Sequence, residues 1–235
     1  PVLHNAGYVA TGLEGWEYTR IRCEVEELPS VVGGADPSFR GFSVTMPCKF
    51  AALDFADEVT GRARQIGSAN TLTRIDGGWR ADNTDCEGAL VALRELLGST
   101  PVRNAVLVGA GGTARAVVWA LREAGCERLT VINRSDRSAE FDELTESIDV
   151  AFRSFDTDLQ ETTMQADVVV STVPADALQG QAAYLGHAPV FDVIYSPWPT
   201  PLATCAASNG YPVVGGLSML AGQSYAQFEQ FTGIE

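Results

Sequence analysis

A run of glycines directly after an apolar segment is the feature that most constrains this chain. Residues 106–116 read Val-Leu-Val-Gly-Ala-Gly-Gly-Thr-Ala-Arg-Ala, which fits a strand, a G-x-G-x-x-A turn and the start of a helix. Gly109 permits the sharp turn, Gly111 lets a pyrophosphate approach the backbone, and Ala114 lets the helix pack closely against the strand. Free N–H groups at the helix start then hold the phosphates. The run predicts a dinucleotide-binding unit; the alternative is a glycine-rich turn in an unrelated α/β fold.

The sequence after residue 104 alternates between apolar strands and amphipathic helices, which indicates a parallel sheet covered by helices. The expected strands are residues 105–108, 129–132, 167–171, 190–193 and 213–214, and the expected helices are 113–124, 138–144 and 222–231.

The first 84 residues instead mix short helices with short strands. A hairpin is expected around Asp76-Gly77-Gly78, and a long helix is expected to follow Thr84 and to end at Gly98. The other expected elements are helices at 2–10 and 26–32, a helix that starts at Pro47 and continues over 48–57, and strands at 16–23, 42–45, 71–75 and 79–81.

The residues after the second strand of the alternating region indicate the cofactor. An NAD site places a carboxylate there to bind the ribose hydroxyls. This strand is followed by Asn133-Arg134-Ser135, and Arg134 offers a cation and a planar face for a 2′-phosphate and an adenine ring. The sequence therefore predicts NADP. A second phosphate partner would be Arg137 or Arg115, each of which could equally be a surface arginine.

Lys49 stands out because it is the only lysine among the 16 basic side chains, and the chain has only two histidines. It follows Pro47 closely, so it is expected in the first turn of a helix, where the positive helix end disfavours an ammonium ion by up to about 1 kcal/mol. Arginine cannot readily release a proton, so a site that needs proton exchange could not use it. We therefore expect Lys49 to act as a general acid and base, against the alternative of an ordinary surface lysine.

Composition excludes several classes of protein. The chain is 46% hydrophobic and 20% charged, which is enough apolar material for a buried core. No apolar run approaches the ~18 residues that would span a bilayer. The net charge of -14 argues against nucleic acid or an anionic membrane as a partner. The five cysteines form no C-x-x-C pair, which favours a reducing cytoplasm and no metal site. Nothing in the sequence decides between a monomer and a homodimer.

Several motifs, taken in order, resemble the shikimate dehydrogenase family. The resemblance covers nearly the whole chain. The matching motifs are Val44-Thr45-x-Pro47-x-Lys49, Gly67-x-Ala69-Asn70-Thr71, Asp82-Asn83-Thr84-Asp85-x-x-Gly88, Gly109-Ala110-Gly111-Gly112, Asn133-Arg134, Tyr195-x-Pro197-x-x-Thr200-Pro201-Leu202 and Gly216-Leu217-x-Met219-Leu220-x-x-Gln223.

The resemblance implies an NADP-linked oxidoreductase that interconverts 3-dehydroshikimate and shikimate on the route to chorismate and aromatic amino acids. It implies two α/β domains with a cleft between them: a substrate-binding domain over residues 1–84, a connecting helix over 85–101, a Rossmann-type domain over 102–214, and a segment over 215–235 that returns to the first domain. The implied catalytic pair is Lys49 and Asp85.

The resemblance also implies binding residues. The implied substrate-binding residues are Thr45, Asn70, Asp85, Tyr195 and Gln223, and the implied cofactor-binding residues are Gly109, Ala110, Gly111, Gly112, Thr113, Asn133, Arg134, Arg137, Gly216 and Met219.

Two departures from the family pattern concern the ends of the chain. Family members begin with a strand and a Ser-x-Ser-Pro segment that binds the substrate carboxylate, and Pro1-Val2-Leu3-His4 resembles the continuation just after it. The family usually has one more helix after the position of Glu235. We therefore expect the sequence to be a fragment of a longer protein.

Three other functions remain open at this stage. A quinate/shikimate dehydrogenase would tolerate an extra hydroxyl and often prefers NAD, but no acidic residue follows the second strand. A folate-pathway dehydrogenase of similar shape would not need the motifs at Asn83-Thr84-Asp85 and at 195–202. A non-catalytic NADP-binding relative would not need Lys49 and Asp85.

Overall fold

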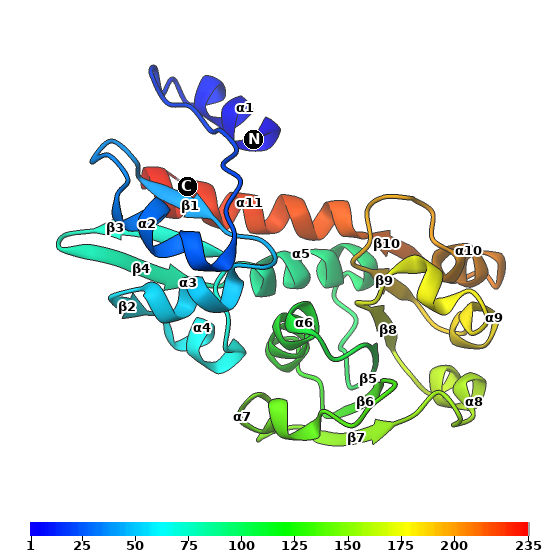
Figure 1. Ribbon diagram of the computed structural model, residues 1–235. Helices are drawn as coiled ribbons and strands as arrows, with labels where there is room; N and C mark the ends of the chain where they lie inside the picture. The colour runs from blue at the N-terminus through cyan, green and yellow to red at the C-terminus, as the bar shows by residue number, and fades with distance from the viewer. Residues whose placement is uncertain (235) are drawn as a thin grey trace. The chain divides into compact units, whose positions relative to one another are not determined.

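The computed structural model describes residues 1–234, and their contacts divide them into two units. The first unit comprises Pro1–Thr84 together with the chain from Gln223 onward, and the second comprises Asp85–Gly222. Figure 1 labels the elements of both units. No helix among the described residues is long and apolar enough to cross a membrane.

A four-stranded sheet forms the centre of the first unit, in the order β1-β3-β4-β2. The two central strands form the predicted hairpin, which turns at Gly77 with φ +90°. β2 pairs parallel with β4, and the other neighbours are antiparallel. The strands are β1 (Gly41–Ser43), β2 (Glu58–Val59), β3 (Thr71–Ile75) and β4 (Gly78–Asp82), and the helices are α1 (Val2–Ala10), η1 (Val25–Glu27), α2 (Leu28–Gly33), α3 (Lys49–Phe55) and α4 (Gly61–Ile66).

The core of this unit lies between the sheet and the helices α2 and α3. Leu28, Ala52, Leu72 and Trp79 are at most 4% exposed and pack together there. The last helix of the chain, α11 (Gly216–Thr232), contributes its second half to the same unit.

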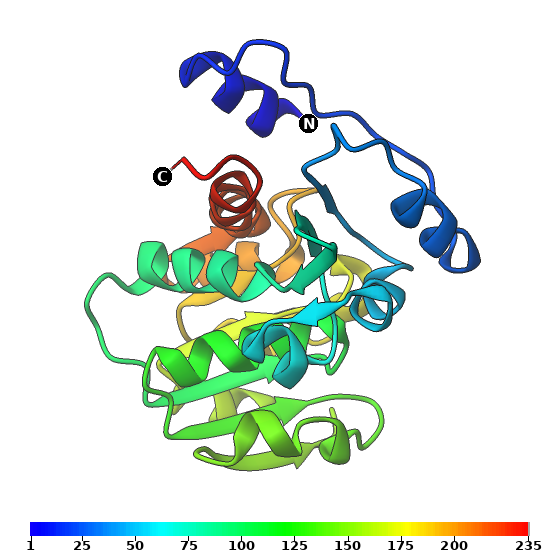
Figure 2. The ribbon, with the colours of Figure 1, turned by 90° about the vertical axis from the view of Figure 1, so that its left-hand side faces the viewer.

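Two expectations for the first unit are wrong. Residues 16–23 form no strand, because their extended backbone has no ladder partner among the described residues. Figure 2 shows them within the loop that joins α1 to α2. A cavity of about 860 Å³ lies beside them, lined also by β1. Pro47 does not begin the third helix: it lies in a turn, and α3 begins two residues later. The amide of Ala52 donates to the carbonyl of Cys48 (2.8 Å), which makes Cys48 the N-cap.

A parallel six-stranded sheet forms the second unit, in the order β10-β9-β8-β5-β6-β7. This is the strand order of the doubly wound dinucleotide-binding fold, so the expected α/β class with a Rossmann-type sheet is confirmed. The strands are β5 (Asn104–Val108), β6 (Arg128–Ile132), β7 (Asp149–Arg153), β8 (Val168–Ser171), β9 (Val190–Asp192) and β10 (Val213–Gly215).

Helices cover both faces of this sheet: α5 and α6 lie on one side, and α8, α9 and α10 lie on the other (Figure 1). The central strands β8 and β9 are buried throughout and β5 is buried from Ala105 to Val108, which explains their continuous apolar sequences. The helices are α5 (Asp85–Leu97), α6 (Gly112–Glu123), η2 (Ser138–Glu140), α7 (Asp142–Thr145), α8 (Leu159–Met164), η3 (Ala175–Leu178), α9 (Ala182–Leu185) and α10 (Pro201–Ser208).

Two expected helices of this region differ from the structure. The helix expected at 138–144 is split into η2 and α7 at Phe141, which is fully buried and whose φ of -113° departs from a regular helix. The helix expected at 222–231 begins six residues earlier, at Gly216 directly after β10.

Candidate active site

The glycine turn of the second unit lies where β5 and β8 run side by side. Gly109 follows β5 with φ +102°, a conformation that side chains disfavour. A Cβ there would lie 2.6 Å from Thr172 Oγ1 and 2.8 Å from Val173 Cγ1. Since the strand order reverses between β5 and β8, this is the topological switch point at which such sheets bind ligands.

The next two glycines have open space where Gly109 has none. Among the described residues, no atom apart from those of the adjoining residues and the backbone of α6 itself lies within 4 Å of a Cβ built on Gly111 or Gly112. Gly111 is the N-cap of α6, and no side chain caps that helix end. The first N–H groups of a helix have no partners within it, so this helix end suits an anionic ligand. The turn therefore fits a dinucleotide pyrophosphate. The other two expected residues of this turn are Ala110, which is buried, and Thr113, which is half-buried.

The residues after β6 fit NADP better than NAD. Asn133 donates from Nδ2 to the carbonyl of Ser135 (2.9 Å), and this bond shapes the turn. Arg134 is exposed, and no hydrogen bond or ion pair joins it to any residue that the structure describes. The nearest carboxylate along the chain, Asp136, accepts a hydrogen bond from the Ser138 amide (2.8 Å). The chain thus presents a cation at the position where an NAD site has a carboxylate.

The two arginines expected as second phosphate partners differ in their surroundings. Arg137 forms a bidentate ion pair with Glu140, at 2.6 and 2.8 Å. The Nε of Arg115 is buried without a hydrogen-bond partner, and burial lowers the pKa of this guanidinium, against the attraction of Glu140 and Glu143. A buried donor without a partner is costly. Of these two arginines, it is therefore Arg115 whose guanidinium has a buried N–H group without a hydrogen-bond acceptor among the described residues.

In the first unit, backbone hydrogen bonds bring three expected site residues together. The amide of Ala69 donates to the carbonyl of Lys49 (3.0 Å), and the amide of Val44 donates to the carbonyl of Asn70 (2.7 Å). Thr45 follows Val44 directly and is exposed. Lys49 is half-buried as the first residue of α3, which confirms its expected place in the first turn of a helix.

Asn70 itself is 3% exposed, and its amide oxygen accepts three hydrogen bonds. The donors are the backbone N–H of Thr84 (2.8 Å), the hydroxyl of Thr84 (3.1 Å) and the hydroxyl of Thr71 (2.8 Å). The side-chain amide of Gln227, from α11, donates to Thr71 Oγ1 (3.0 Å). Asn70 therefore has a fixed side chain within a buried polar cluster.

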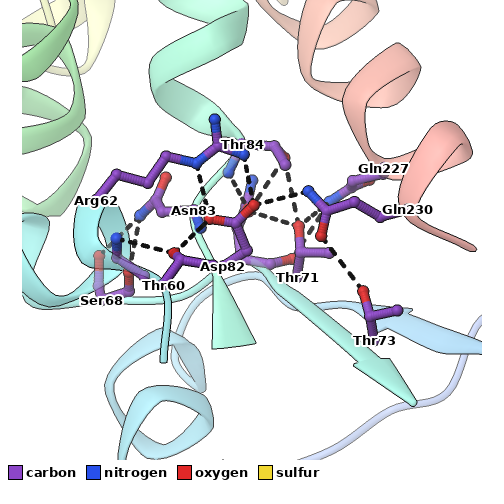
Figure 3. Close-up of polar contacts among 12 residues, drawn as sticks. Thr60, Arg62, Ser68, Thr71, Thr73, Asp82, Asn83, Thr84, Gln227 and Gln230 are labelled. Carbon is purple, nitrogen blue, oxygen red and sulfur yellow. Dashed lines mark hydrogen bonds and ion pairs between the residues drawn. The ribbon is translucent and has the colours of Figure 1, made fainter. Parts of the chain in front are cut away.

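Asp82, at the end of β4, is the centre of a second cluster, which Figure 3 shows. Its carboxylate forms a bidentate ion pair with Arg62 and accepts hydrogen bonds from Thr60 Oγ1 (2.7 Å), Gln230 Nε2 (2.7 Å) and the Asn83 amide (2.8 Å). Burial alone would raise the pKa of Asp82, but these donors and the charge of Arg62 bring it below the ordinary value of 3.8. The cluster connects α4 and α11 to the strand that leads into the Asn83-Thr84 segment.

The other expected residues lie as follows. Asp85 is the first residue of α5 and is 5% exposed. Tyr195 is 57% exposed after β9. Gly216 begins α11, where a Cβ would lie 2.0 Å from the Val193 carbonyl oxygen, and Met219 is buried one turn later. These four belong to the second unit, whereas the half-buried Gln223 belongs to the first.

Several residues of these clusters were not among the expected site residues. Asp82 and Thr84 lie within a motif that we matched, but no role was assigned to them. Gln227 and Gln230 carried a signal that could have found them: with Gln223 they are spaced by four and three residues, so all three lie along one face of α11. Among the described residues, no group of three or more His, Cys, Asp or Glu side chains could hold a metal ion.

Comparison with known proteins gives two family matches. The substrate binding domain of shikimate dehydrogenase matches residues 1–72, and the shikimate / quinate 5-dehydrogenase family matches residues 92–182. The chain is 38% identical to the shikimate dehydrogenase (NADP(+)) of Citrifermentans bemidjiense, over 99% of this chain and 85% of that protein.

Solved structures are similar over the whole chain. A shikimate dehydrogenase from Mycobacterium tuberculosis matches with a TM-score of 0.94 and 48% identity, covering 100% of this chain and 89% of that one. A shikimate 5-dehydrogenase from Thermus thermophilus, in complex with NADP(H) and shikimate, matches with a TM-score of 0.82 and 31% identity, covering 100% and 88%.

Proposed function

The chain belongs to the shikimate dehydrogenase family, and we propose that it catalyses the reversible, NADP-linked reduction of 3-dehydroshikimate to shikimate. In this role it would serve the route to chorismate and aromatic amino acids. The observation that carries the proposal is the pair of backbone hydrogen bonds that join the segments of Thr45, Lys49 and Asn70 in the first unit. These are three residues on which the family's substrate chemistry would depend.

NADP fits the second unit, and when bound it supplies the hydride. The open backbone at Gly111 and Gly112 would hold the pyrophosphate at the start of α6. Arg134 would bind the 2′-phosphate, because a guanidinium forms short, charge-assisted hydrogen bonds to phosphate oxygens. By resemblance, Gly216 and Met219 would lie near the nicotinamide.

Lys49 would transfer the proton. Reduction of the C3 ketone places negative charge on its oxygen, and Lys49 Nζ donates a proton to that oxygen; in the oxidation direction Nζ takes the proton back. Asp85 would orient the lysine and a substrate hydroxyl. An anion beside Lys49 favours the ammonium form, and the positive end of α3 favours the neutral amine, so the two influences oppose each other.

Substitution of Lys49 tests this assignment in the full-length enzyme. Lys49→Met should lose nearly all turnover of shikimate with NADP+. Lys49→Arg should lose it as well, because arginine keeps the charge but does not readily release a proton. NADP+ binding, measured by fluorescence titration, should stay normal in both. Arg22→Met, which removes a side chain that is 92% exposed, is the matched control and should be fully active.

One assay separates the alternatives. Nicotinamide absorbance is followed with shikimate or quinate, and with NADP+ or NAD+, for the unsubstituted enzyme. Turnover of shikimate with NADP+ supports the proposal, and preference for quinate with NAD+ supports a quinate dehydrogenase. Absence of turnover in all four combinations, with NADP+ still bound, would identify a non-catalytic relative. Near-normal turnover by Lys49→Met would remove this lysine from the mechanism.

A further inference from the structure

The hydrogen bonds around Asn70 determine which way its side-chain amide points. The backbone N–H of Thr84 lies 2.8 Å from Asn70 Oδ1, and a backbone N–H can only donate. The atom that it meets must therefore be the amide oxygen. The alternative assignment, with the NH₂ group at this position, would set two donors against each other.

The hydroxyl of Thr71 is compatible with the same orientation and contacts the amide oxygen from a second side. Gln227 Nε2 lies 3.3 Å from the backbone carbonyl of Asn70, which can only accept, so this atom of Gln227 is a donor. The same Nε2 donates to Thr71 Oγ1 (3.0 Å). Thr71 Oγ1 also lies 3.3 Å from Thr84 Oγ1; since the Thr84 N–H already places the amide oxygen of Asn70 here, the Thr71 hydroxyl donates to Asn70 Oδ1 (2.8 Å). Ser43 Oγ donates to Gln227 Oε1 (2.7 Å) and holds the glutamine in this orientation.

The Thr84 hydroxyl adds a third donor, at 3.1 Å from the same oxygen. Thr71 and Thr84, the two residues that supply these three hydrogen bonds, are both 0% exposed. The acceptor capacity of Oδ1 is therefore fully used within the protein. Asn70 can form a hydrogen bond to a ligand only as a donor, through its amide nitrogen.

We propose that Thr84 and Thr71, the latter oriented by Gln227, are positioning residues that hold Asn70 as a hydrogen-bond donor toward a substrate oxygen. The inference rests on the proposed function, in which Asn70 binds shikimate. A donor suits this role because both a hydroxyl and a carbonyl oxygen accept hydrogen bonds. An amide oxygen at the same place could bind a hydroxyl but would repel a carbonyl.

Removal of the two hydroxyls tests the proposal. In the full-length enzyme, Thr84→Val and Thr71→Val should each raise the KM for shikimate about two- to fivefold, and the double variant should raise it about tenfold or more. The change in kcat should be smaller, and the KM for NADP+ should not change. Thr84→Ser keeps the hydroxyl and should restore the normal KM. Thr73→Val is the matched control: its hydroxyl is on the same strand but donates to Gln230 Oε1 (3.3 Å).

A second variant tests the donor directly and does not depend on the double variant folding. In Asn70→Asp one carboxylate oxygen can still accept the three hydrogen bonds, so the thermal midpoint should be preserved, while the donor toward the substrate is lost. Shikimate binding should then fall at least tenfold. A folded double variant with normal KM, or an equal change in Thr73→Val, would overturn the inference and leave the proposed function standing. An unsubstituted enzyme without activity on shikimate would overturn both.

Discussion

Gly109 approaches Thr172 so closely that a Cβ on the glycine would lie 2.6 Å from the threonine Oγ1. Thr172 cannot easily retreat, because its amide and its hydroxyl both donate to the Val108 carbonyl, at 2.9 and 3.0 Å. The glycine turn after β5 is therefore tied to the end of β8. Glycine is required at position 109 for two reasons: the positive φ disfavours other residues, and Thr172 leaves no space for a Cβ.

Gly109→Ala should lower the free energy of unfolding by about 2–4 kcal/mol, the sum of an unfavourable backbone conformation and an overpacked contact. The measurement is urea unfolding followed by circular dichroism. Gly125→Ala is the matched control, because Gly125 has a similar φ of +89° but a Cβ there would meet no atom within 4 Å in the described part of the chain beyond its immediate neighbours. It should cost only about 1–2 kcal/mol. Equal losses in the two variants would show that crowding against Thr172 contributes nothing.

Arg134 should decide the preference between the two nicotinamide cofactors. Arg134→Gln removes a charge-assisted bond to the 2′-phosphate, which is worth about 1.5–3 kcal/mol. We expect the KM for NADP+ to rise about tenfold or more and the KM for NAD+ to stay nearly constant. Arg128→Gln, at the other end of the same strand, should change neither value. An equal loss with both cofactors would contradict a role in 2′-phosphate recognition.

Asp82 should stabilise the first unit in a pH-dependent way. Its folded pKa lies below the unfolded value of 3.8, so the carboxylate contributes its full stability above that value and loses it as pH falls through the folded pKa. Asp82→Asn should cost about 3–5 kcal/mol at pH 7, because it removes the carboxylate charge that forms a bidentate ion pair with Arg62. The difference from the unsubstituted protein should shrink below about pH 4. A difference that stays constant down to pH 3 would contradict this ionisation.

Asp136→Asn is the control for that series. Hydrogen bonds from Ser138 also lower the pKa of Asp136, but this side chain is fully exposed. Its replacement should leave the unfolding midpoint in urea nearly unchanged at every pH.

Local chemistry explains which parts of the fold could be predicted. The turn at Gly109 and the helix closed by Gly125 depend on residues within a few positions of each other, and β5, α6 and β6 agree with the sequence prediction to within one residue. Residues 16–23 show the opposite case. Their alternating pattern permits a strand, but a strand also needs a neighbour, and pairing is not a local property.

The residues of the candidate site likewise include some that depend on local sequence and some that depend on distant parts of the chain. Lys49 could be selected because it is the only lysine in the chain, and Asn70 because it lies in a short motif that resembles the family's. Gln227 could not, because it meets Thr71 across 156 positions of sequence. The role of Asp82 depends likewise on Gln230, which lies 148 residues away. The sequence therefore predicts residues for substrate chemistry, whereas the residues that hydrogen-bond to them across the fold were not predicted.

Asp192 should respond to pH in the opposite sense to Asp82. Burial raises the pKa of Asp192, against the hydrogen bonds from Thr200 Oγ1 (2.7 Å) and the Ile194 amide (3.2 Å). The folded protein therefore binds this proton more tightly than the unfolded chain. The contribution of Asp192 to stability is most favourable below the unfolded value of 3.8 and is lost as pH rises through the folded pKa.

Asp192→Asn removes this titration and keeps an acceptor for the Ile194 amide. Relative to the unsubstituted protein, its unfolding free energy should rise as pH increases from about 4 and level off above the folded pKa. The measurement is urea unfolding at pH 4.5, 6 and 7.5, with Asp82→Asn in the same series. Over this range Asp192→Asn should gain on the unsubstituted protein, whereas the deficit of Asp82→Asn should stay nearly constant, because Asp82 contributes its full stability above about pH 4. A loss of stability in Asp192→Asn that grows with pH would mean that hydrogen bonding to the carboxylate outweighs its burial.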